Sequence, residues 1–233
     1  MKPDTGGTPI RYLALATDYD GTLAEDGRVH PATVLALERL RASRRRLLMV
    51  TGREIPDLLS VCPEVTLFDL IVAENGALLY DPADGRETLL AEPPPAQLVA
   101  ALELRGVQPI SMGRAIIATW TPHEVAVLEV IRDLGLEHEI IFNKGAVMVL
   151  PDGITKATGL RAALQALKLP AESVVGVGDA ENDHSFLDLC GCAVAVANAI
   201  PAIQRRADLV TTGARGSGVT ELIDRLLADD LAS

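Results

Sequence analysis

Short runs of apolar residues alternate along the chain with longer segments in which apolar positions recur every three or four residues. The short runs are almost continuously apolar, which is typical of parallel strands covered on both faces. They span 11–17, 46–51, 69–74, 173–179, 192–198 and 207–212. The longer segments predict amphipathic helices over 31–43, 155–169 and 217–232. This alternation predicts an α/β fold with a Rossmann-like, doubly wound parallel sheet.

The middle of the chain, residues 81–151, has a different pattern, with strands in closer succession than a parallel sheet allows. Two short strands are expected within 109–120, and a hairpin over 138–151. Helices over 95–106 and 122–135 separate them. The turn-rich stretches 81–85 and 151–153 suit two linkers. We therefore predict a core in two parts, 1–80 and 152–233, with a small α+β cap inserted over 81–151.

Composition and charge narrow the possible partners. With 48% hydrophobic and 23% charged residues, the 233-residue chain is expected to fold around a packed core. A net charge of −11 argues against nucleic acid or an anionic membrane as the main partner. There is no apolar run of membrane-spanning length, and residues 1–12 lack the apolar centre of a signal peptide. Three cysteines make no disulfide framework, so we expect a cytoplasmic protein. We also expect a monomer or a homodimer.

Polar residues gather where three of the predicted strands end. Because ligands of open parallel sheets bind outside the carboxyl ends of the strands, these residues are expected to meet in one crevice. A lysine at the start of the 155–169 helix joins them if that helix faces the same crevice. The set is Asp18 and Asp20 after the first strand, Thr51 and Gly52 after the second, Asp179 and Asp183 after 173–179, and Lys156.

These residue types suit phosphoryl transfer. Carboxylates this close repel one another unless a cation is present, and an all-oxygen ligand set favours Mg²⁺. Asp18 could attack phosphorus, while Asp20 could protonate the leaving alcohol and later deprotonate water. The Thr51 hydroxyl, backbone N–H groups such as that of Gly52, and the Lys156 ammonium could bind phosphate oxygens. Taken singly, each stretch also fits a plain turn, helix cap or solvated surface.

The same residues resemble a known family. "DYDGTL" (18–23), "TGR" (51–53), Lys156 and "GDAENDHSF" (178–186) are similar to the four motifs of the haloacid dehalogenase (HAD) superfamily. "ENGA" (74–77) resembles a stretch of the branch whose cap lies between the second and third motifs. The resemblance implies an aspartyl-phosphate on Asp18, with Asp20 as general acid and base. It also implies Mg²⁺ arranged by Asp18, the Asp20 carbonyl, Asp179 and Asp183, and a further phosphate contact from Asn182.

The substrate is less well defined by the sequence. The size and layout most resemble archaeal-type phosphoglycolate phosphatases, with sugar phosphatases of the same branch next. Four cap residues are candidates for contact with the substrate: Arg114, His123, Asn143 and Lys144. Arg114 or Lys144 could meet a carboxylate, although charged residues in turns are usually only solvated. Glu74 and Asn75 either shape the entrance or only form a turn.

We therefore predict a Mg²⁺-dependent phosphatase acting on a small phosphorylated metabolite. Two alternatives remain at this point. A phosphomutase would use the same aspartyl-phosphate but return the phosphoryl group to the sugar. A non-catalytic, phosphate-binding regulatory subunit would bind ligand without turnover.

Overall fold

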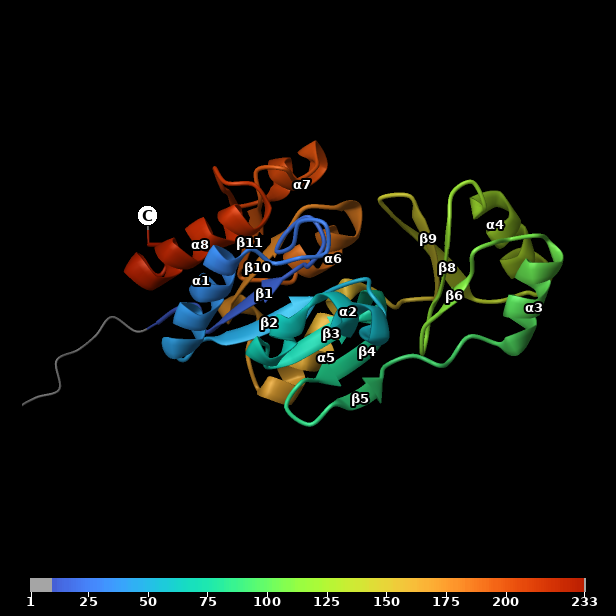
Figure 1. Ribbon diagram of the computed structural model, residues 1–233, viewed down its shortest axis with the longest axis horizontal. Helices are drawn as coiled ribbons and strands as arrows, with labels where there is room; N and C mark the ends of the chain where they lie inside the picture. Colours follow the sequence, from blue (N-terminus) through green and yellow to red (C-terminus); the bar gives the residue numbers. More distant parts are fainter. Residues whose placement is uncertain (1–9, 233) are drawn as a thin grey trace, which may run out of the picture.

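The computed structural model describes residues 10–232, arranged as a larger α/β core and a smaller α+β module beside it (Figure 1). We expected residues 1–12 to lack the apolar centre of a signal peptide, and residues 1–9 of that stretch lie outside the described residues. Between residues 10 and 232, no helix combines the length and apolar character that a membrane span requires.

The core is built on an eight-stranded sheet in the order β12-β11-β10-β1-β2-β3-β4-β5. The six predicted strands form its parallel part, and their side chains are largely buried, as the continuous apolar runs require. They are β1 (Ala14–Thr17), β2 (Arg46–Val50), β3 (Leu70–Ala73), β10 (Val174–Gly178), β11 (Cys192–Ala195) and β12 (Leu209–Val210). The predicted fold class is confirmed.

The chain winds away from β1 and β10 in opposite directions. β1 leads through α1 (Pro31–Ala42) to β2, whereas β10 leads through α6 (His184–Leu187) to β11 on the other side. Because such crossovers are right-handed, these helices lie on opposite faces of the sheet. α8 (Arg215–Asp229) packs against α1, and α5 (Lys156–Leu167) packs against α6 and β3. Three short helices were not predicted from the sequence: α2 (Ile55–Val61), α6 and α7 (Pro201–Arg206).

Two antiparallel strands that were not predicted extend the core sheet. β4 (Leu78–Asp81) pairs with β3, and β5 (Arg86–Leu89) pairs with β4 at the edge of the sheet. The stretch 81–85, which we expected to be a linker, is the turn that joins them. β5 therefore belongs to the larger sheet, although it lies within the range 81–151 proposed for the cap. The division of the chain at residues 80 and 151 stays a prediction.

The inserted module is a four-stranded antiparallel sheet in the order β6-β7-β9-β8. Its strands are β6 (Ser111–Met112), β7 (Ile117–Trp120), β8 (His138–Asn143) and β9 (Ala146–Pro151). The helices α3 (Ala96–Leu104) and α4 (Glu124–Asp133) form an apolar core with one face of this sheet, through residues such as Ile117, Val147 and Val149. Residues on alternate positions of β7 and β9 point the other way, toward the α/β core.

Candidate active site

The site lies at the switch point of the sheet, where β1 and β10 are neighbours but lead to opposite sides. Asp18 directly follows β1, and its backbone N–H donates to the Val177 carbonyl of β10 at 3.0 Å. Asp179 directly follows β10, and its carboxylate accepts a hydrogen bond from the Thr22 hydroxyl at 3.0 Å. The ends of the two strands thus bring the first and last acidic stretches together, as the sequence predicts.

Three buried carboxylates lie close together, and the Lys156 ammonium bonds to two of them. Oxygens of Asp18, Asp179 and Asp183 lie within 4.8 Å of one another. Lys156, only 2% exposed at the start of α5, donates to Asp18 and to Asp183, each at 2.6 Å. The second oxygen of Asp183 accepts the backbone N–H groups of Asp179 and Ala180. Asp183 is therefore held rigidly by the loop that it belongs to.

Burial and like charge disturb the ionisation of this cluster. Burial, with the neighbouring Asp183, raises the pKa of Asp18 to about 7, although Lys156 opposes the shift. Burial also raises the pKa of Asp179. Burial alone would lower the pKa of Lys156, but the carboxylates of Asp18 and Asp183 outweigh that effect and raise it, so the ammonium stays charged. The cluster therefore favours a cation near the carboxylates.

Asp20 is held by Arg53, which was not predicted as a site residue. Arg53 donates to both oxygens of Asp20, at 2.7 and 2.8 Å, and also to Asp57 at 2.6 Å. This fork-to-fork pairing fixes the position and the plane of the carboxylate. Arg53 directly follows Gly52, so its place beside two predicted site residues was the signal that could have found it.

The other predicted core residues lie close by. Thr51 is buried, and its hydroxyl accepts the Arg53 backbone N–H at 3.1 Å. The Asn182 side chain donates to the Asn75 side chain at 2.9 Å. The side-chain oxygen of Asn182 is buried and has no hydrogen-bond partner among the described residues. Asn75 thus supports the site rather than only forming a turn. The phosphate-binding roles of Thr51, Gly52, Lys156 and Asn182 stay predictions.

The tip of the β8–β9 hairpin brings the module into the site. Lys144 donates to the Asp20 backbone carbonyl at 2.6 Å and to the Asp179 carboxylate at 3.0 Å. Asn143 lines the same cavity, and its side-chain oxygen has no partner among the described residues. Arg114 instead pairs with Glu87 at 2.8 Å, and His123 lies 2.9 Å from the Gln108 carbonyl oxygen. Neither Arg114 nor His123 is among the residues that line the cavity.

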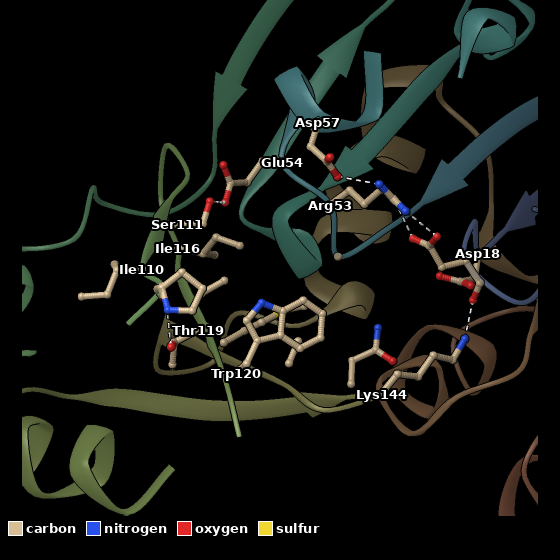
Figure 2. A pocket seen from close by; sticks show the side chains of 17 residues that line it. Asp18, Arg53, Glu54, Asp57, Ile110, Ser111, Ile116, Thr119, Trp120 and Lys144 are labelled. Atoms are coloured by element: carbon tan, nitrogen blue, oxygen red, sulfur yellow. Dashed lines mark hydrogen bonds and ion pairs between the residues drawn. The ribbon is translucent and has the colours of Figure 1, made fainter. Parts of the chain in front are cut away.

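A cavity of about 580 Å³ separates the acidic cluster from the open face of the module (Figure 2). Its core side includes Asp18, Asp20, Gly52 and Arg53. Glu54 and Asp57, which were not predicted, also line this side. Its other wall is mainly apolar and was also missed: Pro109, Ile110, Ile116, Ala118, Trp120, Ala146 and Met148. These apolar residues carry no chemical signature in the sequence, so only the packing of the module on the core identifies them.

The acidic cluster fits a divalent metal ion. Its ligand atoms are hard carboxylate oxygens, which Mg²⁺ prefers. Burial raises the pKa of Asp18 and of Asp179, and a cation beside these carboxylates would favour their ionised forms. Lys144 contacts the Asp20 carbonyl and Asp179, two of the groups that we predicted as metal ligands. A buried aspartate triad that can hold a metal is thus present, and the identity of the ion is a proposal.

Comparison with known proteins identifies the family. A family model of haloacid dehalogenase-like hydrolases matches residues 15–102 and 125–223. The chain belongs to this family. A phosphoglycolate phosphatase of Methanothermobacter thermautotrophicus is 30% identical over 92% of this chain and 98% of its own length. Phosphoglycolate phosphatase 2 of Saccharolobus solfataricus is 28% identical, with 93% of each chain covered. The predicted family, and with it the prediction of a hydrolase, is confirmed.

Solved structures agree with this HAD fold. A haloacid dehalogenase-like hydrolase from Bacteroides thetaiotaomicron superposes with a TM-score of 0.80 at 19% identity, covering 92% of this chain and 99% of that chain. A sugar phosphatase described as HAD subclass IIB gives a TM-score of 0.74 at 21% identity, with 91% and 98% covered. At these identities the likeness concerns the fold alone.

Lys144 and a metal ion at Asp179 would compete for the same oxygens. We therefore expect Lys144→Met to lower the Mg²⁺ concentration that gives half-maximal activity about threefold to tenfold, because the tethered ammonium no longer occupies those groups. Metal titration by calorimetry without substrate measures the same change directly. The exposed Lys168→Met is the matched control and should not change either value. An increased Mg²⁺ requirement in Lys144→Met would contradict this competition.

Glu74 joins the core to the module. Its buried carboxylate, 1% exposed, accepts the backbone N–H groups of Arg114 and Ala115, both at 2.8 Å. Gly113, in the same turn, leaves no room for a side chain, because an added Cβ would lie 2.7 Å from this carboxylate. Glu74 therefore positions the turn that leads into Ile116, one of the cavity-lining residues.

We expect Glu74→Gln to lower the free energy of unfolding by about 1–3 kcal/mol. The amide has a single oxygen, so it accepts a hydrogen bond from only one of the two N–H groups, and its NH₂ group then faces the other. Gly113→Ala should act in the same direction through its clash. Chemical denaturation measures the change. Glu87→Gln, at an exposed glutamate paired with Arg114, should stay within about 0.5 kcal/mol of the wild type. Equal losses for Glu74→Gln and Glu87→Gln would exclude this role for Glu74.

Proposed function

We propose that this HAD hydrolase is a Mg²⁺-dependent phosphatase that cleaves small phosphate monoesters through a phosphoryl group carried on Asp18. The observation that supports it most directly is the arrangement of two different carboxylates on one short loop. Asp18 is buried against Lys156, whereas Asp20 is held at the cavity by Arg53. One carboxylate thus lies beside the ammonium that we propose binds phosphate, and the other borders the cavity that we propose receives the leaving group.

In the first step a carboxylate oxygen of Asp18 forms a bond to phosphorus as the bond from phosphorus to the ester oxygen breaks. The leaving oxygen takes a proton from Asp20. Asp20 must therefore carry a proton when this step begins, and it becomes a carboxylate as the alcohol leaves. Arg53 then stabilises the Asp20 carboxylate through its two hydrogen bonds. Lys156, already 2.6 Å from an Asp18 oxygen, lies where it can neutralise charge on the phosphoryl oxygens.

In the second step a water molecule attacks the phosphorus of the aspartyl-phosphate. Asp20 accepts its proton, the bond from phosphorus to Asp18 breaks, and phosphate leaves with the Asp18 carboxylate restored. Asp18, the backbone carbonyl of Asp20, Asp179 and Asp183 would hold Mg²⁺, which when bound neutralises negative charge on the phosphoryl oxygens. Thr51, Gly52 and Asn182 are proposed to complete the phosphate site.

The relatives named phosphoglycolate phosphatase support phosphoglycolate as the first substrate to test, and sugar phosphates as the second. The chain's three cysteines are free thiols, which supports a reducing, cytoplasmic setting. Net negative charge supports a small metabolite rather than nucleic acid as the substrate.

Phosphate release from a panel of monoesters, with Mg²⁺ and with chelator, tests this function. Phosphoglycolate, hexose phosphates, nucleoside monophosphates and an aryl phosphate form the panel. We expect release that requires Mg²⁺ and disappears in Asp18→Asn. Transfer of the phosphoryl group within a sugar phosphate, without release, would instead support a phosphomutase. Tight phosphate binding without turnover of any ester would support a regulatory subunit.

A further inference from the structure

The module turns an apolar sheet face toward the catalytic loop. Residues alternate along β7 and β9, so that Ala118 and Trp120 share a face with Ala146 and Met148, their paired neighbours. All four line the cavity, as do Ile110, directly before β6, and Ile116, directly before β7. Figure 2 shows Trp120 between these isoleucines and Lys144, on the side of the cavity opposite Arg53 and Asp57. The wall is therefore apolar where a leaving group would extend.

The cavity is larger than the smallest esters need. Its volume of about 580 Å³ lies within the range of roughly 300–1,000 Å³ found for sites that bind drug-sized ligands. A two-carbon leaving group bonded to a phosphate beside Asp18 would leave most of the apolar wall uncovered. Trp120 is 54% exposed although it lines the cavity, and an exposed indole has a π-face available for stacking.

The charges around the cavity disfavour a carboxylate on the leaving group. Among the described lining residues, Arg53 and Lys144 are the cations, and both already contact carboxylates. The rim adds the carboxylates of Glu54 and Asp57. The side-chain oxygen of Asn143 is buried without a partner and can accept a hydrogen bond from a hydroxyl or amino group. The lining thus suits an uncharged group with an apolar face.

We propose that the sheet face around Trp120 is a leaving-group subsite for an aromatic ring. On this proposal, which rests on the phosphatase function above, the chain cleaves phosphate monoesters of ring-bearing alcohols more efficiently than it cleaves phosphoglycolate or simple alkyl phosphates. The ring stacks on the indole while the phosphate lies beside Asp18 and Lys156. The chemistry of the two catalytic steps is unchanged, and only the selection of the ester differs.

Benzyl phosphate and ethyl phosphate form a matched pair of substrates, because both are esters of primary alcohols and differ mainly by the ring. We expect kcat/KM for benzyl phosphate to exceed that for ethyl phosphate and for phosphoglycolate about tenfold. In Trp120→Ala the benzyl-to-ethyl ratio should fall about fivefold or more, whereas Trp120→Phe should keep most of it. Phe142→Ala, an exposed aromatic on β8 outside the cavity lining, is the control and should keep the full ratio.

Binding can be followed without turnover, because Trp120 is the only tryptophan in the chain. Benzylphosphonate, which has no cleavable ester bond, should quench the indole fluorescence and bind about tenfold more tightly than ethylphosphonate. Equal affinities, or an unchanged benzyl-to-ethyl ratio in a folded Trp120→Ala, would overturn the subsite. Absence of phosphate release from every ester, with the fluorescence change intact, would instead overturn the phosphatase function and leave the ring site standing.

Discussion

Asp18→Asn is expected to lower kcat for every phosphate ester by about 10⁴-fold or more, because an amide cannot supply the anionic oxygen that attacks phosphorus. The substitution keeps the shape of the side chain, and it leaves the Asp18 backbone N–H bond to Val177 in place. Phosphate release under single-turnover and steady-state conditions measures the loss. A variant that retained a tenth of the wild-type rate would remove Asp18 from the nucleophile's role.

Two controls separate this effect from damage to the fold. Asp188→Asn changes an exposed aspartate paired with Arg206 at the C-terminal end of α6, and it should keep full activity. The pKa of Asp18 is raised from 3.8 to about 7, so the ionised carboxylate destabilises the metal-free fold above pH 7 and not below about pH 4. In chelator at pH 8, Asp18→Asn should therefore have a melting temperature equal to or above that of the wild type.

The fold could be predicted where a strand is buried on both faces, because such strands are continuous apolar runs. β1 and β10 are examples, with every side chain buried. β5 was missed because its four residues, including Arg86 and Glu87, are all exposed at the edge of the sheet. The seven residues of α2 and the four of α6 are too few for a helical period to be recognised. Burial, rather than secondary structure itself, is thus what the sequence reports.

The core of the site could be located from the sequence because strand ends of a parallel sheet meet at one edge. Asp18, Asp179 and Lys156 meet there, although Lys156 is separated from Asp18 by the whole module. The substrate wall could not be located in this way, because the role of Trp120 depends on which face of a hairpin turns toward the core. Arg114 illustrates the same limit, since it lies in the predicted turn but is engaged by Glu87.

Lys156→Met should be the most damaging single change to the metal-free protein. Methionine replaces the apolar part of the side chain but removes the ammonium that bonds to Asp18 and Asp183, each at 2.6 Å. Two buried carboxylates are then left without their common cation, which costs about 3–5 kcal/mol when one partner of a buried pair is lost. We expect the free energy of unfolding in chelator to fall by that amount, and kcat/KM to fall about 10³-fold because phosphate also loses this charge.

The two losses should respond differently to compensation, and that difference tests the argument. Saturating Mg²⁺ supplies positive charge to the carboxylates, so it should restore much of the stability of Lys156→Met but little of its kcat/KM. In chelator, adding Asp183→Asn to Lys156→Met removes one of the two unpaired charges, so the double variant should be more stable than the single one. The exposed Lys168→Met on the C-cap of α5 should match the wild type throughout. If the double variant were instead less stable than Lys156→Met, repulsion between buried carboxylates would not be what Lys156 relieves.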